Sequence, residues 1–193
     1  MMAQIQQEEK VNLGAKKFNM WIFIFTSFML FAAWSSGFIV YSGGRGHGLD
    51  VIMPRAFLYS TIIIVMSSVT LFIASRAAKQ SQLEKQRLYL WMTFFLGIAF
   101  FIAQFYAFYV LAYKMDIRFT DSNASHTFIY VFAGIHLIHV FAGLWVLLNT
   151  LRASYRNTSQ VINLFKMEMT SIFWHFLDII WIYLYVFLLL NQY

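Results

Sequence analysis

The ionisable residues that could do chemistry inside this chain gather in two apolar stretches near its C-terminal end. GIHLIHVFAG places His136 and His139 three positions apart. FWHFLDIIW places His175 and Asp178 three positions apart, and Glu168 stands seven positions before His175. Side chains three or four positions apart lie on one face of an α-helix. Each stretch is therefore expected to carry a polar face on an otherwise apolar helix.

Three kinds of site fit these residues. Histidines on facing helices, such as His139 and His175, could be axial ligands of a haem or ligands of a metal ion. Imidazoles and carboxylates inside a membrane could also carry protons. The third reading is structural, because buried donors and acceptors usually bond to one another. We expect the third and predict no catalytic, cofactor-binding or metal-binding residue. The predicted structural network consists of His136, His139, Glu168, His175 and Asp178.

Small and polar residues in the same runs predict how the helices pack. Gly134, Ala142 and Gly143 lie close to the histidine pair, and small residues let the backbones of membrane helices approach closely. We therefore expect a neighbouring helix to pack tightly here. Gln104 lies in another apolar run and is expected to form a hydrogen bond between helices.

The composition identifies a membrane protein. Of the 193 residues, 61% are hydrophobic and 11% are charged, against about 25% charged residues in a soluble domain. The chain has no cysteine, which excludes disulfides, thiolate metal sites and thiol catalysis. The net charge of +6 comes from lysines and arginines that flank the apolar runs, so no nucleic-acid partner is expected.

Five apolar runs reach the roughly 20 residues that a helix needs to cross a bilayer. Their unbroken apolar sequence favours helices over a barrel, whose strands alternate apolar and polar residues. The connections are too short to fold alone. The sequence thus predicts an all-α bundle of five transmembrane helices over residues 18–193, after an N-terminal tail of residues 1–17. The predicted runs cover residues 18–41, 56–75, 88–113, 127–150 and 171–190.

The basic residues predict the orientation of this bundle. Ten lysines and arginines fall on the side of the N-terminal tail, and four fall on the opposite side. Cytoplasmic segments carry the excess of such residues. We therefore expect a cytoplasmic N-terminus and an outside C-terminus. The four residues on the opposite side are Arg45, Arg55, Lys114 and Arg118.

The motifs of the last two runs resemble subunit III of the haem–copper oxidases, the cytochrome c oxidase subunit III family. That family shows Trp-His-Phe-x-Asp-x-x-Trp in its last helix, preceded by a glutamate, and Gly-x-His-x-x-His-Val in the helix before. The matching positions are Trp174, His175, Phe176, Asp178, Trp181, Glu168, Gly134, His136, His139 and Val140. Weaker matches in the second and third runs are Pro54, Thr61, Ser67, Ser68, Leu96, Gly97 and Gln104.

The resemblance extends from Asn19 to Tyr193 and is closest to the short bacterial form with five helices. Two departures limit it. Ser27 stands where longer members carry a glutamate in the helix that corresponds to the first run, and Ala107 stands where they carry another. Roles in lipid or proton contacts that the family assigns to those carboxylates are therefore not expected in this chain.

The resemblance implies an accessory role in aerobic respiration. In the family, haem and copper belong to subunits I and II, where oxygen reduction and proton pumping occur. Subunit III packs mainly against subunit I, also meets subunit II, binds phospholipid and keeps the catalytic subunit active. Other respiratory complexes, joined in a supercomplex, are further candidate partners. The resemblance also implies a multi-pass protein of the bacterial plasma membrane.

Three rival functions stay open from the sequence. The chain could be subunit III of a quinol oxidase, because the electron donor is chosen by the partner subunits. It could be a small membrane cytochrome that uses its histidines as haem ligands. It could also be a transporter, although transporters usually show internal repeats or helices broken at mid-membrane, and neither is evident.

Overall fold

The fold is known from a computed structural model that describes residues 2–43, 49, 51–117, 119, 124–156 and 159–192, with the side chains of 2–12 and 124 left out. This part of the chain contains five long helices and no strand. Each helix is long and apolar enough to cross a membrane, which confirms the predicted all-α, five-helix architecture. The helices are α1 (Met2–Gly43), α2 (Arg55–Lys79), α3 (Leu83–Tyr109), α4 (Ala124–Tyr155) and α5 (Gln160–Leu190). A π-helical turn, η1 (Val110–Lys114), extends α3.

The helices extend beyond the apolar runs that the sequence marks. α5 begins at Gln160, whereas the last apolar run begins only at residue 171. α1 includes most of the predicted N-terminal tail. Hydropathy marks only the part of a helix that suits hydrocarbon, whereas backbone hydrogen bonds continue into polar residues. Of the basic residues used for the orientation, Arg45, Arg118 and the side chain of Lys10 lie outside the described part.

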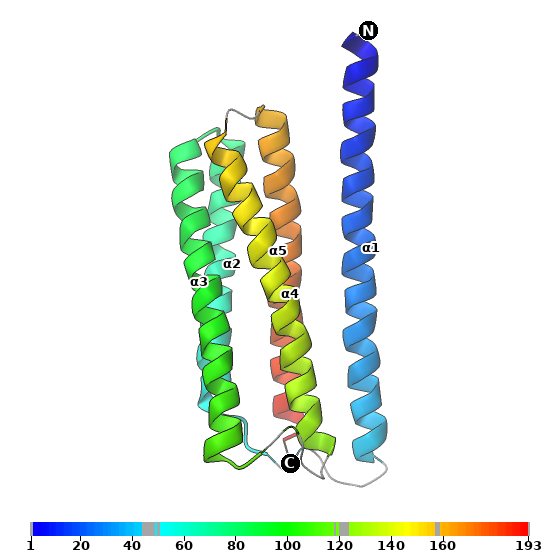
Figure 1. The fold of residues 1–193 in the computed structure, drawn as a ribbon, viewed down its shortest axis with the longest axis vertical. Helices are drawn as coiled ribbons and strands as arrows, with labels where there is room; N and C mark the ends of the chain where they lie inside the picture. The colour runs from blue at the N-terminus through cyan, green and yellow to red at the C-terminus, as the bar shows by residue number, and fades with distance from the viewer. Residues whose placement is uncertain are drawn as a thin grey trace.

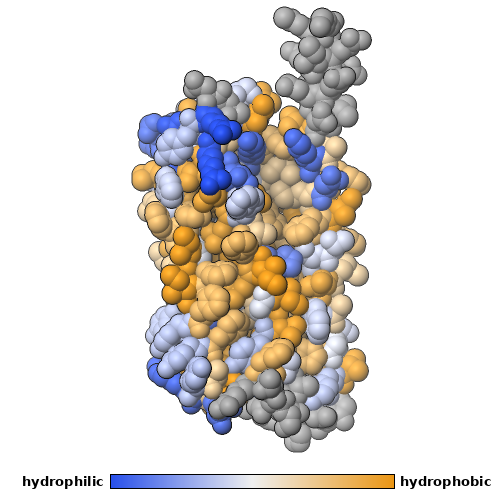
Figure 2. Space-filling view, in the orientation of Figure 1, coloured by the Kyte–Doolittle hydropathy of each residue, from blue (hydrophilic) through white to orange (hydrophobic). Residues whose placement is uncertain are grey.

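In Figure 1, α4 and α5 lie between the pair of α2 and α3 on one side and α1 on the other. The backbone of α5 lies beside those of α1, α2 and α4, and the backbone of α3 lies beside those of α2 and α4. Side chains also join α3 to α5. α1 stands at the side of the bundle and contacts only α4 and α5 among the described elements. Figure 2 shows a mostly apolar band across the middle of the face in view, with hydrophilic side chains gathered toward the two ends. This pattern fits a bundle that crosses a bilayer.

Sequence signals explain how α2 begins and ends. Pro54 directly precedes its first residue, where the missing proline N–H removes no helical hydrogen bond. Arg76 and Lys79 lie in its last turn, where cations interact favourably with the helix dipole. Ser81 then adopts a positive φ of 57°, and the turn allows α3 to start at Leu83 and pack along α2.

The buried indole of Trp174 on α5 packs closely against Gly97 and Gly143, so a larger side chain at either position would crowd it. A Cβ atom built on Gly97 of α3 would lie 2.8 Å from Trp174 Cη2 and 2.8 Å from a methyl carbon of Leu144. A Cβ atom on Gly143 of α4 would lie 2.8 Å from a methyl carbon of Leu177. The expectation of tight packing therefore holds at Gly143, although side chains rather than a backbone make the contact. It is wrong at Gly134, where no described atom from beyond the neighbouring helical turns lies within 4 Å of the added Cβ.

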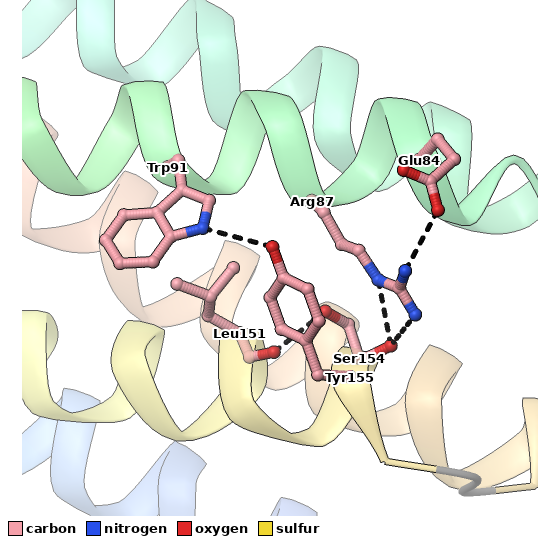
Figure 3. A network of polar contacts seen from close by, with 6 residues as sticks. All are labelled: Glu84, Arg87, Trp91, Leu151, Ser154 and Tyr155. Carbon is pink, nitrogen blue, oxygen red and sulfur yellow. Dashed lines mark hydrogen bonds and ion pairs between the residues drawn. The ribbon is translucent and has the colours of Figure 1, made fainter.

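Arg87 of α3 holds the C-terminal end of α4 (Figure 3). Its Nε and Nη2 atoms donate to the backbone oxygen of Ser154 at 3.1 and 2.6 Å, and its Nη1 donates to Glu84 at 3.0 Å. Its guanidinium carbon lies 4.5 Å from the ring centroid of Tyr155. The last carbonyls of a helix lack partners within the helix, so Arg87 supplies one from outside.

Candidate functional site in the membrane-spanning helices

His175 and Asp178 of α5 lie in a groove beside α2. His175 Nδ1 lies 2.7 Å from Ser68 Oγ of α2 and 3.7 Å from Asp178 Oδ2. Asp178 is 4% exposed, and neither of its carboxylate oxygens has a hydrogen-bond partner in the described part of the chain. The imidazole of His175 is partly open to the outside of the bundle. This is the most polar point near the middle of α5.

His139 of α4 is bonded through both ring nitrogens. Its Nδ1 lies 2.8 Å from the carbonyl oxygen of Ile135, and its Nε2 lies 3.2 Å from Ser27 Oγ of α1. A carbonyl oxygen can only accept, so Nδ1 donates to Ile135 and Nε2 of the neutral ring accepts from the hydroxyl of Ser27. His139 therefore joins α4 to α1.

His136, one turn earlier on α4, has a different environment. It is fully buried, and its ring centroid lies 5.0 Å from that of Trp181, 5.8 Å from that of Phe100 and 6.5 Å from that of Phe31. Neither ring nitrogen has a hydrogen-bond partner among the described residues. His136 thus fills an aromatic box between four helices.

Glu168 lies toward the N-terminal end of α5, where its side chain is about half exposed. Its carboxylate accepts from Lys17 Nζ of α1 at 2.5 Å, and both side chains are about half exposed. The pair joins α1 to α5 at the end of the bundle that holds the N-terminus of α1. Exposed ion pairs of this kind contribute about 0–1 kcal/mol.

The comparison with known proteins identifies the family. The model of the family described as "Cytochrome c oxidase subunit III" matches residues 4–192. This chain belongs to the cytochrome c oxidase subunit III family. The chain is therefore a subunit of a haem–copper oxidase complex, which is an oxidoreductase assembled with other subunits.

Relatives of this subunit III occur in two kinds of oxidase. Cytochrome c oxidase subunit 3 of Alkalihalophilus pseudofirmus is 28% identical over 178 residues, which cover 89% of this chain and 85% of the relative. Cytochrome bo(3) ubiquinol oxidase subunit 3 of Buchnera aphidicola subsp. Schizaphis graminum is 30% identical over 183 residues, or 91% and 94%. Cytochrome c oxidase subunit 3 of Bacillus subtilis is 28% identical over 186 residues, or 92% and 87%. These bacterial relatives, together with the five membrane-length helices of this chain, support a multi-pass bacterial membrane protein.

The subunit III motif residues of α5 attach this helix mainly to α2. Trp174 Nε1 donates to Ser67 Oγ at 3.0 Å, and Trp181 Nε1 donates to Thr61 Oγ1 at 3.0 Å. Phe176 packs against the main apolar core. These contacts place donors and acceptors of α2 opposite those of α5, so the motif positions serve helix packing.

The five polar residues do not form the single network that the sequence predicted. The structure brings His175 and Asp178 together beside α2, but joins His139 to α1, pairs Glu168 with Lys17 and leaves His136 among aromatic rings. The physical reason is that positions i and i+3 differ by about 60° around a helix, since each residue turns about 100°. That difference is enough for two side chains to meet different neighbouring helices.

Several bonded polar residues of this subunit III were missed from the sequence. Gln86 and Asn163 are buried and exchange two amide hydrogen bonds of 3.1 and 3.0 Å between α3 and α5. The sequence offered one signal for the bond of Gln86, its amide side chain at the edge of an apolar run. Gln104, by contrast, forms the hydrogen bond between helices that the sequence predicted: its Nε2 donates to Ser60 Oγ of α2 at 2.8 Å, while its Oε1 has no partner within the described part.

The described residues can be compared with what a metal ion or a haem requires as ligands. No group of three or more His, Cys, Asp or Glu residues in the described part could hold a metal ion. An axial haem ligand uses a free lone pair on an imidazole nitrogen, and the lone pair of His139 Nε2 accepts from Ser27. The pair of His139 and His175 therefore does not fit the ligation of a haem in the arrangement described.

Proposed function

We propose that this chain is the non-redox subunit III of a bacterial cytochrome c oxidase and that it stabilises the catalytic subunit I. The observation that carries the proposal is the use of polar groups between helices. His139 bonds to α1, while His175, Trp174 and Trp181 bond to α2. These side chains organise a rigid surface against which another subunit can pack.

The proposal assigns haem and copper to the partner subunits I and II. The engaged nitrogens of His139 support it, since a ligand would have to displace Ser27 or Ile135. The lack of cysteine in the sequence supports it too, because thiolate ligands cannot be supplied by this chain. No residue of this chain is assigned a catalytic role.

The proposal includes bound phospholipid. α3 and α4 form an apolar groove of about 330 Å³ on the outside of the bundle, lined by Phe94, Phe141, Leu144, Trp145 and Leu148. Such a groove suits an acyl chain, which needs no hydrogen-bond partner. The proposed orientation keeps the N-terminus cytoplasmic, because most of the basic residues fall on that side.

The test is purification of the oxidase through a tag on this chain. We expect haem-containing subunit I and subunit II to co-purify and the preparation to oxidise reduced cytochrome c with oxygen. Deleting the gene for this chain should leave the haem spectrum of the remaining complex unchanged and shorten the time for which it stays active during turnover. Haem absorbance from the chain expressed alone would refute the proposal.

A second candidate is subunit III of a quinol oxidase. The observation that favours it is the 30% identity to the bo(3) ubiquinol oxidase subunit 3 of a Buchnera aphidicola strain. The same purified complex distinguishes the two donors. Rapid oxygen consumption with a reduced quinol, and none with reduced cytochrome c, would establish the second candidate.

A further inference from the structure

A groove runs along the outside of the bundle between α2 and α5. One hollow of about 450 Å³ lies toward the end that holds the N-terminus of α1 and includes Ser75, Lys79, Glu168 and Ser171. A second hollow of about 340 Å³ lies nearer mid-membrane and includes Ser68, His175 and Asp178. Among the described residues, those that line both hollows come from α2 and α5. We call this the α2–α5 groove.

The α5 side of the groove is one continuous helical face. Its lining residues recur at intervals of three and four positions, which is the spacing of a single face. The positions on this face are Glu168, Ser171, Ile172, His175, Asp178, Ile179 and Ile182. The groove therefore has the length and direction of a helix that would lie along α2 and α5.

The polar groups in the groove are incompletely satisfied by this chain. His175 bonds to Ser68, and Asp178 lies beside both of these side chains, but His175 Nδ1 is 3.7 Å from Asp178 Oδ2, which is beyond hydrogen-bond distance. Both Asp178 oxygens lack a partner in the described part. A carboxylate at membrane depth costs a few kcal/mol or more. An occupant of the groove that donates a hydrogen bond would recover part of this cost.

Depth distinguishes a helix from a lipid as the occupant. Asp178 is ten positions beyond Glu168 on α5, which at 1.5 Å per residue is about 15 Å. The hydrocarbon layer is about 30 Å thick. A headgroup that reaches the exposed Glu168 and Lys79 would leave Asp178 beside acyl chains, which have no donor. A transmembrane helix can place a donor side chain at this depth.

The exposed side of α4 provides a contrast. On α4, the exposed side chains Ile138, Phe141 and Trp145 are apolar or aromatic and suit lipid directly. The described α2–α5 groove instead combines hydroxyls, an imidazole and a carboxylate. Of these two described faces, the groove is the one that requires a polar neighbour.

We propose that the α2–α5 groove seats a transmembrane helix of another oxidase subunit, and that this helix donates a hydrogen bond to Asp178. The inference rests on the proposed function, because it assumes assembly with the other subunits. It deepens that function by naming the surface of this chain that makes the contact and the chemistry of the partner: an apolar helix with one donor side chain near mid-membrane.

Site-specific photo-crosslinking in the assembled oxidase tests the proposal. p-Benzoylphenylalanine is introduced at Ile179 of α5 or at Val65 of α2, which are 65% and 42% exposed in the groove. The matched control is Ile138 of α4, which is 70% exposed near the middle of its helix. After illumination of the purified complex, we expect the two groove variants to form covalent adducts with another oxidase subunit, and the Ile138 variant to form adducts with lipid.

The outcomes separate the groove from the proposed function. Subunit adducts at either groove position support the proposal, as does failure of both groove variants, but not of the Ile138 variant, to assemble. Assembled groove variants that form only lipid adducts, or none, overturn it. Subunit adducts at Ile138 alone would also overturn it, while leaving the proposed function intact. If the unmodified tagged chain fails to co-purify with any oxidase subunit, the proposed function itself fails.

Discussion

Replacing Gly97 with alanine tests the packing of α3 against α5, and Gly134→Ala is its matched control. Both glycines lie within helices and both changes add one methyl group. At Gly97 that methyl would stand 2.8 Å from Trp174 Cη2 and 2.8 Å from Leu144 Cδ2. At Gly134 no described atom from beyond the neighbouring helical turns lies within 4 Å of it. Carbon atoms in favourable contact are about 3.5–4.0 Å apart, so the neighbours of Gly97 must move by about 0.7 Å or more.

Trp174 is poorly able to make that movement. Its side chain is 1% exposed, and its Nε1 donates to Ser67 Oγ at 3.0 Å, so a shift of the ring strains a buried hydrogen bond. Overpacking of a filled interior costs about 1–3 kcal/mol. We therefore expect Gly97→Ala to lower the free energy of unfolding by about 1–3 kcal/mol relative to Gly134→Ala, which is roughly a 5- to 150-fold change in the unfolding equilibrium.

The assay is equilibrium unfolding of the full-length chain in mild detergent by added sodium dodecyl sulfate, followed by tryptophan fluorescence. The Gly134→Ala variant should unfold at the same detergent fraction as the unmodified chain or at a slightly higher one, because alanine favours the helix over glycine by about 0.5–1 kcal/mol. Gly143→Ala should resemble Gly97→Ala, because its added methyl would lie 2.8 Å from Leu177 Cδ1. Equal midpoints for Gly97→Ala and Gly134→Ala would refute the packing argument.

Three further changes test other contacts in the same unfolding assay. Arg87→Ala should lower stability by about 1–3 kcal/mol because it leaves the Ser154 carbonyl without its charged donor; Lys85→Ala, at an exposed position in the same turn, is the control, and equal effects would contradict this role. Gln86→Leu should cost about 1–3 kcal/mol by leaving Asn163 buried and unpaired. The double change with Asn163→Leu should recover most of the loss, and additive losses would contradict the pairing. Lys17→Met should change stability by about 1 kcal/mol or less, since its pair with Glu168 is exposed, and a larger loss at high salt would argue against screening.

The fold was accessible from the sequence because the bilayer fixes what a spanning segment must look like. Five runs of sufficient length and hydropathy could be read directly, and all five are helices. Their ends were less accessible: the first turns of α5 from Gln160 onward are polar enough to resemble a connection. Hydropathy indicates which residues lie in the hydrocarbon layer. The backbone hydrogen bonds of a helix continue beyond that layer into polar residues.

The candidate site was only partly accessible for a different reason. The i, i+3 spacing correctly suggests that His175 and Asp178 lie together, because both residues belong to one helix. The same spacing says nothing about which neighbouring helix covers the face. The bond from His175 to Ser68 and the bond from His139 to Ser27 each join residues more than 100 positions apart. Serine in an apolar run also has a local alternative, since its hydroxyl can bond to its own helix backbone.

The histidine pair of α4 shows how one motif can serve two structural purposes. His139 faces α1 and has a polar partner for each nitrogen, so it acts as a hydrogen-bonding link between helices. His136 faces the rings of Phe100 and Trp181 and has no such partner in the described part, so its contribution comes from shape and aromatic contact. A neutral imidazole is the only form compatible with that box, because a charged ring without a partner would be far more costly to bury.

The polar residues of α4 and α5 thus differ in whether the chain itself supplies their hydrogen-bond partners. His139 is satisfied inside the chain and His136 is enclosed by rings, whereas Asp178 lines a groove at the surface. A side chain of a partner subunit can therefore reach Asp178 and donate the hydrogen bond that its carboxylate lacks within the described part of the chain.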